Sequence, residues 1–159
     1  MDFKKIFLLL IIGLITISAV NAGLFGSGTQ EVTVDGVNFV LDDTFKITGQ
    51  EDTFINFVVK DGVTGYLTSI VNDEDLEGYI QNDTEFGYTV FEVTSPNDVK
   101  EYGFIDEGID KGYFIVFEKN DHRFVYQISA SLSADDNDVK EIVEAMAKFA
   151  SDNNDLKPI

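Results

Sequence analysis

Oxygen-bearing side chains with the spacing of a calcium loop occur in the middle of the chain. Asp73, Asp75 and Glu77 alternate along this segment, and Gly78 follows them. An EF-hand loop opens in this way, with ligands at positions one, three and five and glycine at position six. A bidentate acid closes the loop at position twelve, where this chain has Thr84. The three acids are therefore weak calcium candidates, and the alternative is the acidic first turn of a helix.

The single histidine, His122, is the only imidazole that could take part in acid–base or metal chemistry. A Ser-His-Asp relay requires a serine beside the imidazole, and the sequence contains no G-x-S-x-G nucleophile elbow. Catalytic zinc needs several nitrogen or sulfur ligands, and the chain has no cysteine. We therefore assign no catalytic and no cofactor-binding residue, and we interpret His122 as a residue beside a tight turn.

Carboxylate pairs recur throughout the chain, and Asp106, Glu107 and Asp110 form one such group. Glycoside hydrolysis needs two carboxyl groups held about 5–10 Å apart across a sugar-binding cleft. No pair is distinguished from the others by its surroundings in the sequence. A small cell-envelope hydrolase that uses a carboxylate pair is therefore an alternative to a non-catalytic role.

Two further patterns concern modification and ligand binding. Asn82 opens the single Asn-x-Thr acceptor for N-glycosylation in the chain. Tyr66, Tyr88 and Tyr102 fall on predicted strands whose buried face the alternation does not define. Their rings are interpreted as core residues, and the alternative is the lining of a ligand groove.

The charge balance is the strongest signal in the composition. The chain has 29 acidic and 11 basic residues, a net charge of −18. Loss of residues 1–22, which include Asp2, Lys4 and Lys5, would leave 28 acidic and 9 basic residues and a net charge of −19. Such a surface repels phosphate backbones and anionic lipid headgroups, which excludes nucleic acid as a partner. It indicates either a solvated acidic surface or a surface for cationic partners.

The beginning of the chain has the pattern of an export signal. Lys4 and Lys5 precede an apolar run over residues 6–20, and Ala22 and Gly23 mark the expected cleavage point. The run is shorter than the roughly twenty residues that span a bilayer as a helix. We expect export, either secreted or to the cell surface. In the alternative the signal is retained, and residues 1–25 anchor the protein to the membrane.

The elements between these residues are mostly strands joined by short turns. Asp35 and Gly36 form an Asp-Gly hairpin turn between residues 31–34 and 37–41, and Asn120 and Asp121 form a second turn. Residues 113–117 are apolar throughout, which predicts a central strand covered on both faces. The remaining predicted strands occupy residues 53–60, 63–71, 86–94, 99–106 and 123–132, and a short helix is predicted at residues 73–81.

A helical pattern closes the domain. Ser133 is a candidate N-cap, and the apolar positions that follow recur at helical spacing. They are Val139, Ile142, Val143, Met146, Phe149 and Ala150. The sequence therefore predicts an α+β fold with a mainly antiparallel sheet of about six or seven strands built from hairpins. One short mid-chain helix and a C-terminal amphipathic helix pack on this sheet, and the signal forms an N-terminal hydrophobic helix.

The predicted domain organisation has four parts. A signal peptide or uncleaved anchor occupies residues 1–22, and a flexible leader rich in glycine occupies residues 23–30. A single α+β domain covers residues 31–151, and residues 152–159 form a loose tail. The mature length suits one domain with one core, and stability must come from packing because no disulfide can form.

Most of the chain resembles small exported proteins of methanogenic archaea, a group with no established activity. The resemblance lies in the signal ending SAVNAG, the hairpin VTVDGVNF and the late hairpin FIVFEKND followed by FVYQISAS. The succession of hairpins with a final amphipathic helix is distantly similar to PsbP-type domains, which are non-catalytic accessory proteins. Those domains have Pro-x-Gly-Phe after the opening hairpin, and this chain has DDTF at residues 42–45. Both resemblances imply a non-catalytic role and supply no site residues.

These observations together predict an exported, non-catalytic acidic domain that binds a partner or ligand at the cell surface or envelope. The hydrolase with a carboxylate pair is the first alternative. A calcium-responsive envelope or adhesion module, which would use Asp73, Asp75 and Glu77, is the second alternative.

Overall fold

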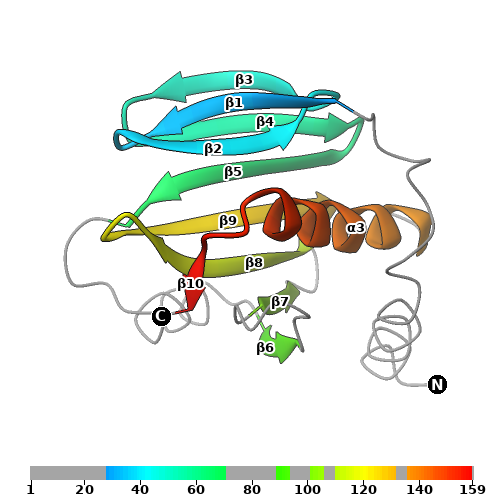
Figure 1. Cartoon of the computed structure of the whole chain (residues 1–159). Coiled ribbons are helices and arrows are strands. Elements are labelled where there is room, and N and C mark those ends of the chain that lie inside the picture. The colour runs from blue at the N-terminus through cyan, green and yellow to red at the C-terminus, as the bar shows by residue number, and fades with distance from the viewer. Residues whose placement is uncertain (1–27, 71–88, 94–100, 106–109, 132–135, 159) are drawn as a thin grey trace.

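The computed structural model describes residues 28–70, 89–93, 101–105, 110–131 and 136–158, and within these residues it contains ten strands and one helix (Figure 1). The elements are β1 Thr29–Val34, β2 Val37–Asp42, β3 Lys46–Glu51, β4 Phe54–Lys60, β5 Val63–Ser69, β6 Thr89–Val93, β7 Glu101–Ile105, β8 Asp110–Lys119, β9 His122–Ser131, α3 Asp136–Asp152 and β10 Lys157–Pro158.

The strands form two antiparallel sheets. β1 and β2 make a two-stranded sheet, and the other eight strands form one sheet in the order β3-β4-β5-β9-β8-β7-β6, with β10 paired to β8. β10 pairs with Phe117 and Glu118 of β8. β7 pairs with an earlier part of the same strand, from Lys111 to Ile115. The predicted class is confirmed: the described residues form a mainly antiparallel sheet with a C-terminal helix.

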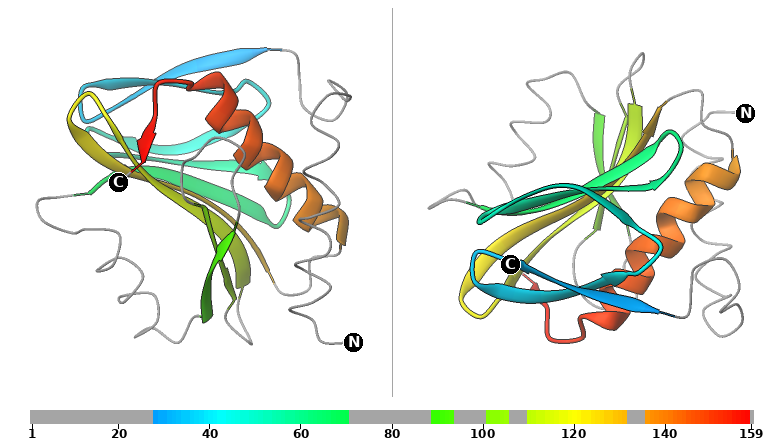
Figure 2. Two further views of the ribbon diagram at one scale, coloured as in Figure 1. Left: turned by 60° about the horizontal axis from the view of Figure 1, so that its bottom comes forward. Right: turned by 90° about the horizontal axis from the view of Figure 1, so that it is seen from above.

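The β1–β2 hairpin and α3 lie side by side over the same face of the large sheet (Figure 2). Apolar side chains of the hairpin, of β4, β5, β8 and β9, and of α3 meet between the layers and form one core. Burial of these side chains is the main stabilising contribution to the fold. The largest fully buried side chains are Tyr113, Tyr126, Phe39, Phe57, Phe114, Phe117, Phe124, Leu41, Ile55, Leu67 and Ile128.

Both predicted tight turns are confirmed. Asp35 and Gly36 have φ values of 51° and 74°, and Asn120 and Asp121 have φ values of 52° and 64°. Two successive residues in the left-handed region match the right-handed twist of the strands that they join. The turns therefore fix the pairing of β1 with β2 and of β8 with β9.

The predicted central strand is also confirmed. Every residue from Lys111 to Phe117 on β8 is buried. On β9, Phe124, Tyr126, Ile128 and Ala130 point into the core, as the alternation predicts. At the neighbouring strand, Gly65 permits a close approach: a Cβ atom there would lie 2.5 Å from Phe57 Cζ and 2.6 Å from the Gln127 carbonyl oxygen.

Several predicted boundaries differ from the structure. β1 begins at Thr29, inside the predicted leader. Its pairing with β2 continues to this residue, because Thr29 lies opposite Asp42. β3 and β10 were not predicted. The chain after α3 is not a loose tail, since Lys157–Pro158 pairs with β8 and Asn153 binds β2.

Other predictions lie outside the described residues. These are the signal helix at residues 1–22, the mid-chain helix at residues 73–81 and the cap at Ser133. In the part of the chain that the structure describes, no helix has the length and apolar character needed to cross a membrane.

Candidate functional site

Three turns of the fold meet at one end of the sheet, and each carries acidic residues. The turns that join β1 to β2, β3 to β4 and β8 to β9 lie together at the left of Figure 1. They contribute Asp35, Asp52 and Asp121, and Glu51 is the last residue of β3, next to its turn. Glu51, Asp52 and Asp121 are exposed, and Asp35 is partly exposed. We call these four residues the acidic end.

Two contacts hold the turns of the acidic end together. The backbone N–H of Asp35 donates a hydrogen bond of 2.6 Å to the carbonyl oxygen of Asp52. His122 Nδ1 lies 2.9 Å from Asp35 Oδ2, and both side chains are well exposed, at 47% and 39%. His122 lies directly after the β8–β9 turn, as predicted, and its imidazole ties this turn to the β1–β2 turn.

The charge of the described surface is uneven, because most lysines are already paired. Lys60, Lys119, Lys140, Lys148 and Lys157 each form an ion pair with a described carboxylate. Six exposed acids, by contrast, form no ion pair with another described residue. They are Glu31, Asp43, Glu51, Asp52, Asp61 and Asp121. Three of these six belong to the acidic end, which makes it the largest group of uncompensated negative charge among them.

The described residues contain no group of three or more His, Cys, Asp or Glu side chains placed to hold one metal ion.

Most of the predicted site residues lie outside the described residues. These are the calcium candidates Asp73, Asp75 and Glu77, the glycosylation candidate Asn82, and the cleavage residues Ala22 and Gly23. Asp106 and Glu107 also lie outside them, and Asp110 begins β8. Of the three tyrosines considered for a groove, Tyr66 is partly buried and its hydroxyl donates a hydrogen bond of 2.8 Å to Gln127 Oε1.

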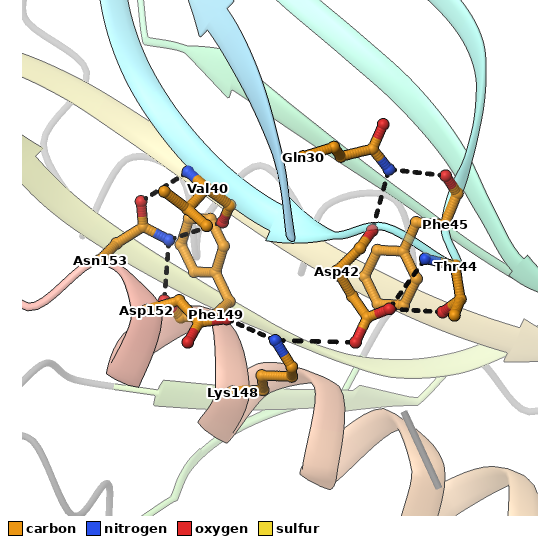
Figure 3. A network of polar contacts seen from close by, with 9 residues as sticks. All are labelled: Gln30, Val40, Asp42, Thr44, Phe45, Lys148, Phe149, Asp152 and Asn153. Carbon is orange, nitrogen blue, oxygen red and sulfur yellow. Dashed lines mark hydrogen bonds and ion pairs between the residues drawn. The ribbon is translucent and has the colours of Figure 1, made fainter. Parts of the chain in front are cut away.

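A second group of polar contacts lies inside the fold, between β2 and the C-terminal end of α3 (Figure 3). Asn153 is 2% exposed. Its Oδ1 accepts a hydrogen bond of 2.9 Å from the Val40 N–H, and its Nδ2 donates to the carbonyl oxygens of Val40 at 2.8 Å and Phe149 at 2.9 Å. The amide thus completes the backbone pairing of β2 on the side away from β1 and attaches the helix to the hairpin.

Asp42, at the end of β2, is the only buried carboxylate among the residues with described burial. Its Oδ1 accepts hydrogen bonds from the Thr44 N–H at 2.9 Å and the Thr44 hydroxyl at 2.5 Å. Its Oδ2 accepts no hydrogen bond from a described residue and lies 3.7 Å from Lys148 Nζ. Lys148 also donates a hydrogen bond of 2.6 Å to Asp152. A buried carboxylate is costly without a positive partner, so Lys148 compensates the charge of Asp42.

Tyr126 lies deep in the core close to this carboxylate. Its ring stacks on Phe149 with centroids 3.8 Å apart, and its hydroxyl is buried and has no hydrogen-bond partner among the described residues. Burial raises the pKa of the Tyr126 hydroxyl well above its ordinary value, and the negative charge of Asp42 raises it further. The hydroxyl is therefore a neutral group that is held away from water.

At the other end of the helix, Lys60 of β4 binds Asp138 and, at 2.9 Å, Glu141. Hydrogen bonds to Asp138 and then to Glu141 raise the pKa of the Lys60 ammonium group well above its ordinary value. Lys60 is thus fully charged at neutral pH and fastens the first turns of α3 to the sheet. This pair and the Asn153 contacts hold the helix at both of its ends.

The sequence did not reveal the buried polar group. Asn153 falls in the predicted tail at residues 152–159, and Asp42 opens the DDTF segment that follows the opening hairpin. No local pattern pairs Asn153 with Val40, because 113 residues separate them.

No family model matches the chain, and no curated protein is significantly similar to it.

Proposed function

We propose that this chain is an exported, non-catalytic domain that binds a cationic partner or ligand at the cell surface or envelope. The observation that carries the proposal is the acidic end, where Asp35, Asp52 and Asp121 gather on three adjoining turns beside Glu51 at the end of β3. Turns on a rigid sheet are common places for binding residues, because the scaffold holds them while their side chains remain accessible. A partner with positive charges would gain both affinity and a faster association rate from this field.

The contacts of the remaining charged and polar groups support the non-catalytic part of the proposal. The imidazole of His122 ties two turns together, and the amino groups of Lys60 and Lys148 join the helix to the sheet and hairpin. These groups stabilise the fold through the contacts that they form. The export part of the proposal rests on the sequence, through Lys4, Lys5, the apolar run and the small residues at positions 20–23.

The test is capture of a partner from the envelope fraction of the producing cell on the immobilised protein. The variant Asp52→Asn/Asp121→Asn removes two charges from the acidic end, and both positions keep a side chain of the same size. The control variant Asp43→Asn/Asp61→Asn removes two exposed charges from the opposite end of the sheet. We expect the first variant to lose the partner and the control to retain it.

Equal loss in both double variants would show that only the net charge matters and would contradict a defined binding surface. The non-catalytic part has its own test, a panel of glycoside, ester and peptide substrates. Turnover that disappears on replacement of one carboxylate would contradict it and would favour the hydrolase alternative.

A further inference from the structure

β3 is the edge strand of the large sheet and lies at the top of Figure 1. Within the described residues it pairs only with β4, along its whole length from Lys46–Val58 to Glu51–Phe54. Four of its six residues are exposed and the other two are partly buried. An edge strand with accessible backbone groups can accept another strand in the same sheet.

A β-bulge between Ile47 and Gly49 interrupts the pairing of β3 with β4. In a regular strand, Lys46 and Glu51 would lie on opposite faces of the sheet, because they are five residues apart. The bulge changes this alternation by one residue. The register therefore places Lys46 opposite Val58 and Glu51 opposite Phe54, and both partners lie on the face of β4 that points away from the core.

The bulge thus makes the strand complementary to itself. If a second β3 is placed antiparallel about a two-fold axis between Thr48 and Gly49, each Lys46 faces the Glu51 of the other copy. Ile47 then faces Gln50, and these two lie on the same face because Ile47 is opposite Phe57 and Gln50 is opposite Ile55. An interface of this isologous kind forms a closed dimer.

Both charged side chains are available for such a contact. Lys46 and Glu51 are exposed, and neither forms an ion pair with another described residue. Opposite charges directly across an antiparallel pair stabilise it, and like charges destabilise it. The net charge of −18 opposes association of two copies, but its long-range part is screened beyond about 8 Å at physiological ionic strength.

We propose that the edge of β3 is a self-association surface, on which a second copy of this chain adds its own β3 in the antiparallel register that pairs Lys46 with Glu51. The dimer would join the two large sheets into one continuous sheet. This surface shares Glu51 with the acidic end but includes neither Asp52 nor Asp121, whose double variant tests partner binding, so dimerisation and partner binding can fail independently.

Charge reversal tests the register. Each single variant, Lys46→Glu or Glu51→Lys, places two pairs of like charges across the interface, and the association constant should fall roughly tenfold or more. The double variant Lys46→Glu/Glu51→Lys restores opposite charges and should dimerise like the original protein. A mixture of the two single variants should form a heterodimer, which also shows that both variants fold.

The measurement is sedimentation equilibrium of the full chain at concentrations up to about 1 mM, with the four proteins and the mixture compared in one buffer. The proposal is overturned if the original protein remains monomeric. Lys46 and the bulge would then serve only to prevent other strands from pairing with this edge. The proposal is also overturned if the single variants associate like the original protein, or if their mixture gains no association.

A cross-linking experiment gives a second readout. The chain has no cysteine, so Thr48→Cys introduces one thiol close to the two-fold axis. This variant should form a disulfide-linked dimer on mild oxidation. Thr64→Cys, at an exposed position of β5, is the control and should remain a monomer. Equal cross-linking of the two variants would contradict the proposed interface.

Discussion

Replacement of Asn153 by alanine removes the contacts that attach the end of α3 to the β1–β2 hairpin. The side chain makes three hydrogen bonds of 2.8–2.9 Å, two with Val40 and one with Phe149. A hydrogen bond contributes about 0.5–1.5 kcal/mol net, and a buried group left without its partner costs about 1–3 kcal/mol. Because Asn153 is 2% exposed, water cannot easily replace the lost contacts. We expect the free energy of unfolding to fall by about 2–4 kcal/mol.

The assay is urea unfolding followed by far-ultraviolet circular dichroism, with the slope of the transition compared between variants. Asn154→Ala is the matched control, because the neighbouring residue has the same side chain but is exposed. It should change the free energy of unfolding by less than about 0.5 kcal/mol. Equal, small effects of Asn153→Ala and Asn154→Ala would show that the stability of the fold does not depend on this attachment.

Two other predictions follow from the core. Gly65→Ala should lower the free energy of unfolding by about 1–3 kcal/mol or more, since the added Cβ would lie 2.5 Å from Phe57 Cζ and 2.6 Å from a backbone oxygen. Gly49→Ala, whose Cβ would lie 3.5 Å from its nearest neighbour, is the control in urea unfolding, and an equal effect would contradict the steric explanation. The pKa of Tyr126 is raised in the folded state, so the unfolded chain releases this proton at lower pH than the folded chain. Below about pH 10 this group does not reduce the free energy of unfolding. Above that pH the unfolded chain loses the proton first, so the free energy of unfolding falls by up to about 1.4 kcal/mol per pH unit. Tyr126→Phe should therefore reduce the loss of stability at alkaline pH without lowering stability at pH 7. If the midpoint of thermal unfolding depended on alkaline pH in the same way in both proteins, the Tyr126 hydroxyl would not be buried without a partner.

The parts of the fold that depend on neighbouring residues could be predicted from the sequence. Asp35 and Gly36 have the residue types that tolerate positive φ, so the opening hairpin follows from two residues. The alternation of Phe124, Tyr126 and Ile128 and the helical spacing of Ile142, Met146 and Phe149 similarly define the faces that are buried together.

The parts that were missed depend on residues far apart in the chain. β3 contains Lys46, Thr48, Gly49 and Gln50 and shows no regular alternation, because it is an exposed edge strand with a bulge. Its pairing with β4 compensates for this weak local pattern. β10 is only two residues long and includes Pro158, so the end of β8, rather than its own composition, determines its conformation.

The candidate site was predictable in kind but not in position. The composition indicates an excess of negative charge, and Asp and Asn residues mark the turns. The grouping of Asp35, Asp52 and Asp121 arises because the hairpin folds back over the sheet and brings three turns to one end. That arrangement is a property of the tertiary fold, and no spacing in the sequence reports it.

Binding of positive charge at the acidic end, as a defined surface, can be measured by titration of the protein with decalysine. Calorimetry at low ionic strength should give binding to the original protein that weakens as salt is added. Asp52→Asn/Asp121→Asn should raise the dissociation constant several-fold more than the control Asp43→Asn/Asp61→Asn, which has the same net charge. Equal dissociation constants for the two double variants, or no binding to any of the proteins, would contradict a defined cation-binding surface at the acidic end.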